Sequence, residues 1–151
     1  MLAKLDIPFI FKKRPAPVPG DLRPMWRISL ILLILLHSRS KKASLRKLHV
    51  VSWAARSPAN RASFVKYSKN EIAKDEIIPR VEPSLNRAID LARGEGLMTI
   101  DGGKNLLLSS TGLLAAEEIN RSTECLMEDK RFLAEIKAFA NETNIDGLLS
   151  W

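Results

Sequence analysis

The pattern of apolar and polar positions is most regular between residues 81 and 112. Apolar residues recur there at the three- and four-residue spacing of one helix face, at Leu85, Ala88, Ile89 and Ala92. Two short apolar runs follow, residues 97–100 and 106–108, and the turn Asp101-Gly102-Gly103-Lys104 separates them. Because its glycines accept the positive φ angles of a tight hairpin, the pattern predicts a helix followed by two antiparallel strands.

Helical spacing also predicts helices over residues 25–36, 44–55, 59–70, 110–120 and 128–141. In the 44–55 helix the core face would hold Leu45, Leu48, Val51 and Ala55, with Arg46 and Lys47 pointing outward. In the next helix Ala62 and Val65 would point inward, with Phe64 as a further candidate. A mainly helical chain with one small two-stranded β-wing is typical of a winged-helix domain, a fold that binds DNA or other proteins.

We divide the chain into an arm (1–24), a winged-helix domain (25–123) and a C-terminal helical extension (124–151) that packs on the domain or on a partner. Prolines at four positions between 15 and 24 exclude a regular helix from the arm and favour an extended segment. The arm either packs along its own domain or lies on another subunit. Large apolar side chains make the candidates for partner contact Phe9, Phe11, Trp26, Trp53 and Trp151.

The longest apolar run, Ile28 to Leu36, is too short to span a membrane. Even counted from Met25, it would rise about 18 Å as a helix, whereas a bilayer core needs roughly 20 residues. A buried core helix is the better interpretation. A single cysteine, Cys125, excludes an intramolecular disulfide, and we expect it to be buried in a cytoplasmic protein.

Charge is distributed unevenly along the chain. Residues 1–75 hold 16 Lys and Arg against 4 Asp and Glu, whereas residues 76–151 hold 8 against 13. A basic half of this density could lie along a phosphate backbone or an acidic protein surface. The candidates for nucleic-acid contact are Arg39, Lys41, Lys42, Arg46, Lys47, Arg56, Arg61, Lys66 and Lys69.

The helix over 81–93 does not favour sequence-specific reading of DNA. Its polar face would expose Glu82 and Asp90 beside Asn86, Arg87 and Arg93, so its net charge is zero. Carboxylates at these positions would face phosphates unfavourably. We therefore predict non-specific contact, made by the basic helices and not by this one.

No pattern of catalytic or metal-binding residues stands out. His37 and His49 have no cysteine or carboxylate cluster nearby at metal-ligand spacing, so both are interpreted as structural. The Ser44-x-x-Lys47 spacing matches some acyl-transfer enzymes, but helix capping explains the serine. The chain also lacks a phosphate-binding loop, so it is predicted to be non-catalytic and to need no cofactor.

Residues 48–58 (LHVVSWAARSP), 83–92 (PSLNRAIDLA) and 94–97 (GEGL), with Arg14-Pro15, resemble a known family. It is the small middle component of bacterial ABC-three-component systems, which include Lamassu-type anti-phage defence. The resemblance implies a winged-helix accessory subunit assembled with an SMC-like coiled-coil ATPase and an effector, often a nuclease, that responds to foreign DNA. It implies no active-site residues.

Two hypotheses follow. The first is a non-catalytic adaptor that bridges the ATPase with DNA, with the effector, or with both. The alternative is a homodimeric winged-helix transcription regulator, which would protect a short palindrome in its own promoter.

Overall fold

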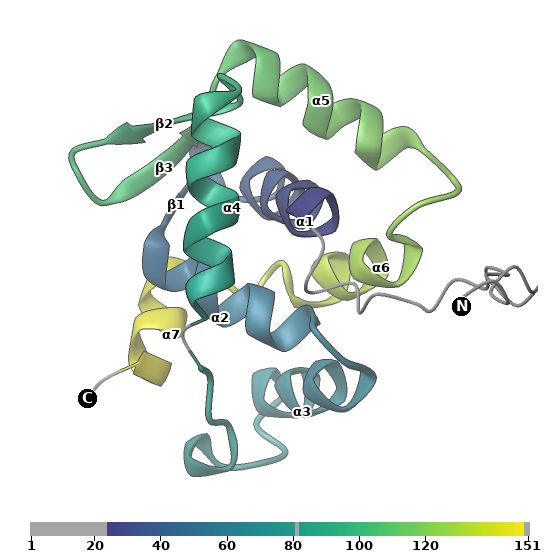
Figure 1. Ribbon diagram of the computed structural model, residues 1–151. Helices are drawn as coiled ribbons and strands as arrows, with labels where there is room; N and C mark the ends of the chain where they lie inside the picture. Colours follow the sequence, from purple (N-terminus) through teal and green to yellow (C-terminus); the bar gives the residue numbers. More distant parts are fainter. Residues whose placement is uncertain (1–23, 81, 150–151) are drawn as a thin grey trace, which may run out of the picture.

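The structure is a computed structural model that describes residues 24–80 and 82–149. Figure 1 shows a mainly helical arrangement with one small sheet. The helices and strands, in chain order, are α1 (Pro24–Leu36), β1 (Lys42–Ser44), α2 (Leu45–Ala55), α3 (Pro58–Ser68), α4 (Pro83–Gly94), β2 (Met98–Asp101), β3 (Asn105–Leu108), α5 (Ser110–Arg121), α6 (Met127–Ile136) and α7 (Glu142–Asp146). The described residues also form the 3-10 turns η3 (Arg39–Lys41) between α1 and β1, η4 (Lys74–Glu76) between α3 and α4, and η5 (Gly147–Leu149) after α7.

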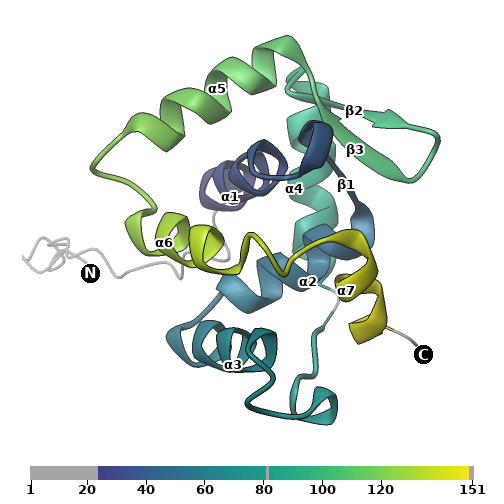
Figure 2. The same ribbon diagram turned by 180° about the vertical axis from the view of Figure 1, so that it is seen from behind.

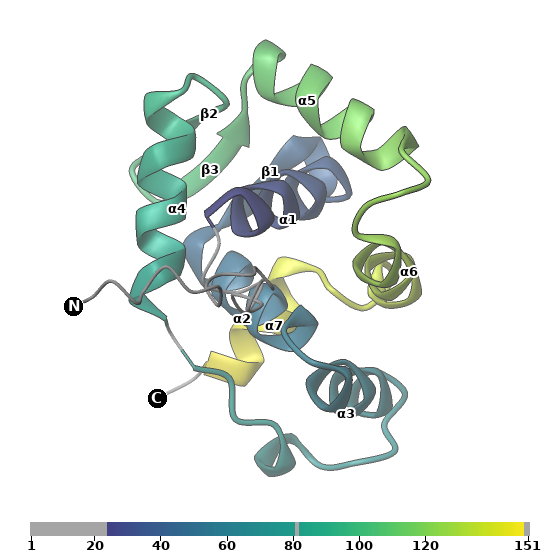
Figure 3. The same cartoon turned by 45° about the vertical axis from the view of Figure 1, so that its right-hand side comes forward.

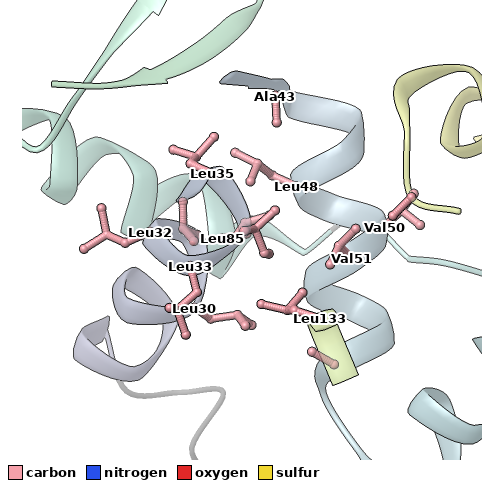
Figure 4. Close-up of a cluster of buried hydrophobic side chains, with 14 of the residues drawn as sticks. Leu30, Leu32, Leu33, Leu35, Ala43, Leu48, Val50, Val51, Leu85 and Leu133 are labelled. Carbon is pink, nitrogen blue, oxygen red and sulfur yellow. The ribbon is translucent and has the colours of Figure 1, made fainter. Parts of the chain in front are cut away.

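Helix α1 is the centre of the core, as its apolar sequence predicts. Every residue from Leu30 to Leu35 is buried, so the helix has no solvent-facing side over this stretch. Figure 3 shows α4, α5 and α6 arranged around it. In Figure 4, leucines of α1 gather with Leu48 of α2 and Leu85 of α4. Among the described residues, no helix has the length and apolar character needed to cross a bilayer.

The sheet has three antiparallel strands in the order β1-β3-β2. The predicted hairpin is present, with Gly102 and Gly103 at φ angles of +67° and +81° in its turn. The prediction of a two-stranded sheet was wrong, because β1 adds a strand by pairing Ala43 with Leu106. Since β1 is three residues long with one buried side chain, it leaves no alternating pattern in the sequence.

Two positions that were predicted to be buried are exposed. In α3 Ala62 is exposed, whereas the further candidate Phe64 is fully buried, with its ring centroid 6.1 Å from that of Phe132 and 5.9 Å from that of Phe139. In α2, Leu45 is exposed, because it opens the helix at the edge of the domain.

Within the described C-terminal residues, two α-helices are present, α6 and α7. The single helix predicted for 128–141 ends at Ile136, and Asn141 caps α7 by accepting a hydrogen bond from the backbone N–H of Asn144. Ile145 of α7 is fully buried in the common core. Cys125 is exposed, contrary to prediction, because it lies in the surface connection between α5 and α6.

Candidate functional site

Five of the nine predicted nucleic-acid contacts line one groove of about 1300 Å³, which we call the basic groove. They are Arg39, Lys41, Lys42, Arg46 and Lys47. The end of α1, η3, β1 and the start of α2 form one side, and residues 140–146 form the other. Figure 2 shows α7 beside β1 and α2 at this position.

Two further lysines complete the groove, and sequence reasoning missed both as contact residues. Lys104 comes from the β2–β3 turn and Lys137 directly follows α6. Lys137 lies in the acidic half of the chain, where no local pattern marks it. Among the described residues, seven Lys and Arg side chains therefore line the groove, against the carboxylates of Glu142 and Asp146.

The turn between α1 and β1 sets the rim of the groove. Ser40 and Lys41 have φ angles of 58° and 56°, in the left-handed region that costs a residue other than glycine about 1 kcal/mol. This backbone reverses the chain within a few residues, and Ser38 anchors it by donating its hydroxyl hydrogen to the Ile34 carbonyl at 2.6 Å. Arg39 and Lys41 are consequently exposed at the rim.

The cations of the groove make weak internal ion pairs. Lys42 Nζ lies 2.9 Å from Asp101 Oδ2, and Arg46 Nη1 lies 3.8 Å from Asp146 Oδ1, with all four side chains well exposed to solvent. Exposed ion pairs of this kind contribute at most about 1 kcal/mol to the stability of the fold. Phosphate groups could therefore replace the two carboxylates at a small cost in free energy.

Lys47 differs from the other cations because its residue is only 7% exposed. The prediction that it points outward was wrong, since α7 covers this part of α2. Burial lowers the pKa of the Lys47 ammonium below its ordinary value, and the nearby Glu142 carboxylate opposes that shift. Lys47 thus presents a partly desolvated charge to the groove.

The other four predicted contacts lie outside the basic groove. Arg56 pairs with Glu82, which was expected to be exposed but is instead a partly buried partner of both Arg56 and Arg27. Arg61 donates to the Ala55 carbonyl at 2.8 Å and to Glu128 at 2.9 Å. The remaining two, Lys66 and Lys69, are exposed on and just after α3.

Arg61 also faces the buried Asp129, whose Oδ1 lies 4.0 Å from Nη1 and accepts no hydrogen bond within the described residues. Burial raises the pKa of the Asp129 carboxyl above its ordinary value of 3.8, and Arg61 offsets only part of that effect. The folded state therefore disfavours the charged form.

Asp129→Asn is expected to raise the free energy of unfolding at pH 7, because the amide carries no charge to bury. Because the pKa of the Asp129 carboxyl is higher in the folded state than the ordinary value of 3.8, the wild type loses stability as the pH rises from 3.8 through the pKa of the folded state. The gain should therefore be largest near neutral pH and shrink as pH falls through that window. Urea denaturation followed by circular dichroism at several pH values measures it, and a loss of stability at pH 7 would contradict the argument.

The exposed face of α4 is poorly equipped to read bases. Asn86 Oδ1 lies 3.3 Å from Nε2 of the buried His49, which fixes this amide against α2. Arg93 lies 4.0 Å from Asp90 on the same helix. Burial lowers the pKa of His49, which agrees with a neutral structural histidine.

The candidates for partner contact divide into two groups. Trp26 and Trp53 are partly buried against the core, so each exposes only part of its ring. The other three, Phe9, Phe11 and Trp151, lie outside the described residues.

No group of His, Cys, Asp and Glu side chains suited to a metal ion occurs within residues 24–80 and 82–149. The lysine and arginine side chains that line the basic groove give it the character of an anion-binding surface. Comparison with protein-family models, curated proteins and solved structures gave no match.

Proposed function

We propose that this chain is a non-catalytic winged-helix adaptor that holds a nucleic-acid backbone in the basic groove and links it to partner subunits. The convergence of seven cations from separate elements on one groove carries the proposal. Contacts between phosphates and Lys or Arg side chains supply most of the non-specific affinity of a protein for nucleic acid. Such contacts require positive charge along a surface and no catalytic pocket.

The order of elements supports the winged-helix part of the proposal. A helix, a short strand and further helices precede a helix that leads directly into a hairpin, and the first strand pairs with the returning strand of that hairpin. In a winged helix this places α4 in the recognition position and makes β2–β3 the wing. Helix α3 would then be an insertion between the two helices of the binding motif.

The position of the cations supports contact with the backbone. They lie on η3 and β1, at the start of α2, on the β2–β3 turn and just after α6, and not on the outer face of α4. A protein that grips phosphates in this way distinguishes nucleic acid from protein but reads little sequence.

For the partners, we propose the SMC-like ATPase and the effector that the sequence resemblance implies, with the complex acting in the cytoplasm. Exposed apolar side chains are available for such contacts, including Leu91 on α4 and Leu114 on α5. The adaptor itself would contribute no catalytic group and no cofactor.

The proposal is tested by measuring the affinity of a short DNA duplex by fluorescence anisotropy at several salt concentrations. Arg39→Glu with Lys41→Glu is expected to weaken binding by about tenfold or more and to lower the salt slope by about two. The matched control is Lys66→Glu with Lys69→Glu, which changes the charge equally outside the groove. Equal losses in both variants, or no binding by the wild type, would contradict the proposal.

A further inference from the structure

The start of α2 already holds an anion, and that anion comes from the chain itself. The Ser44 backbone N–H donates to Glu142 Oε2 at 3.1 Å, and the Ser44 hydroxyl donates to Glu142 Oε1 at 2.6 Å. Ser44 is also the N-cap of α2, accepting a hydrogen bond from the Lys47 N–H at 3.1 Å. Backbone N–H groups and the positive end of a helix dipole favour negative charge at this place.

Lys47 points independently to an anionic ligand. Its residue is more than nine-tenths buried, yet it lines the basic groove. Over the described parts of the chain, no hydrogen bond or ion pair reaches its ammonium group, although the Glu142 carboxylate is near enough to stabilise its charge. The side chain is mostly buried and its end reaches the groove, so the ammonium group is partly desolvated and an additional anionic oxygen at this point would be bound strongly.

Both carboxylates that line the groove within the described residues belong to α7. This helix is five residues long, and Ile145 holds it to the core while Glu142 and Asp146 are exposed. The two acids are placed differently. Glu142 bonds to the start of α2, whereas Asp146 lies 3.8 Å from the exposed Arg46.

We propose that Ser44 and Lys47 form a phosphate subsite of the basic groove, and that Glu142 occupies it as an internal substitute until a nucleic-acid phosphate displaces it. The inference deepens the proposed function and rests on it. A phosphate group offers oxygens to the Ser44 N–H, the Ser44 hydroxyl and the Lys47 ammonium together, whereas the carboxylate bonds to Ser44 alone. Glu142 would thereby set the affinity of the groove, because a phosphate must displace its carboxylate from Ser44.

The first test compares Glu142→Gln with Asp146→Asn in the full chain, because both remove one negative charge from the same helix. Glu142→Gln is expected to tighten binding of a DNA duplex by about fivefold, and Asp146→Asn by less than about twofold. Equal tightening would show that only overall charge matters and would overturn the inference. Unchanged or weaker binding by Glu142→Gln would overturn it as well.

A second test separates this inference from the proposed function by using inorganic phosphate as the probe. Amide chemical shifts of Ser44 and Lys47 are followed by NMR during a phosphate titration. Larger shifts at lower phosphate in Glu142→Gln than in Asp146→Asn would support the subsite even if DNA did not bind. If DNA binds but phosphate moves neither amide in either variant, the subsite is wrong and the proposed function stands.

Lys47→Met provides the coupling test, because methionine fills the same buried space without the charge. In this background the gain from Glu142→Gln should fall below about twofold, since the phosphate loses its buried partner. Circular dichroism checks that the variant is folded. A gain as large as in the wild-type background would exclude Lys47 from the subsite.

Discussion

Glu82→Ala is expected to destabilise the fold by about 3 kcal/mol, the lower end of the range for breaking a buried ion pair. The Glu82 carboxylate lies 3.1 Å from Nη2 of Arg27, a residue that is 3% exposed in the core. Arg27 also donates to Ser52 Oγ of α2 at 3.2 Å. The substitution removes the Glu82 carboxylate from this buried cation. Chemical denaturation followed by circular dichroism measures the change.

Arg56→Ala is the matched control for this prediction. Arg56 binds the same carboxylate, but its side chain is 42% exposed. We expect a loss of less than about 1 kcal/mol, as for exposed ion pairs. If both substitutions lower the free energy of unfolding equally, the burial of Arg27 does not explain the effect of Glu82→Ala.

The same network explains how α4 is placed. Glu82 immediately precedes α4, and its carboxylate reaches α1 through Arg27 and the end of α2 through Arg56. The start of α4 is thus fixed to two helices of the core. Glu82→Ala should accordingly change the amide shifts at the start of α4 more than those of the β2–β3 hairpin.

The sequence predicted the elements whose signals are local. The apolar run of α1, the spacing of Leu85 to Ala92 and the glycine turn each report on their own segment, and all three elements are present. Strand β1 could not be predicted in this way, because its partner Leu106 is far along the chain. The burial of Lys47 and of Glu82 could not be predicted for the same reason. A segment distant in sequence covers Lys47, and another pairs with Glu82.

The candidate site was predicted in part for a similar reason. Arg39 to Lys47 are close in sequence, so they remain together in the fold and supply five of the seven cations that line the basic groove among the described residues. Arg56 and Arg61 were grouped with them by charge alone, but both are engaged in ion pairs elsewhere. Lys104 and Lys137 join the groove through the hairpin and the end of α6, which only the tertiary structure brings to this place.

Gly112→Ala is expected to destabilise the protein by about 3 kcal/mol or more, although alanine favours helix formation. Gly112 lies in the first turn of α5, where a Cβ atom would stand 1.8 Å from the Leu97 carbonyl oxygen and 2.8 Å from its carbon. These are backbone atoms, and the same oxygen accepts a hydrogen bond from the Ser109 N–H at 3.1 Å. The methyl group can therefore be accommodated only by moving α5 away from the base of the hairpin.

Gly94→Ala makes the same chemical change where there is space. Gly94 is the last residue of α4 and does not adopt a positive φ angle, and a methyl group there would meet no heavy atom of the described residues within 4 Å. Alanine at this position should leave stability unchanged or raise it by up to about 0.5 kcal/mol. Denaturation midpoints of the two variants, measured side by side, isolate the effect of the close approach. A Gly112→Ala protein as stable as Gly94→Ala would mean that α5 can shift from Leu97 at little cost.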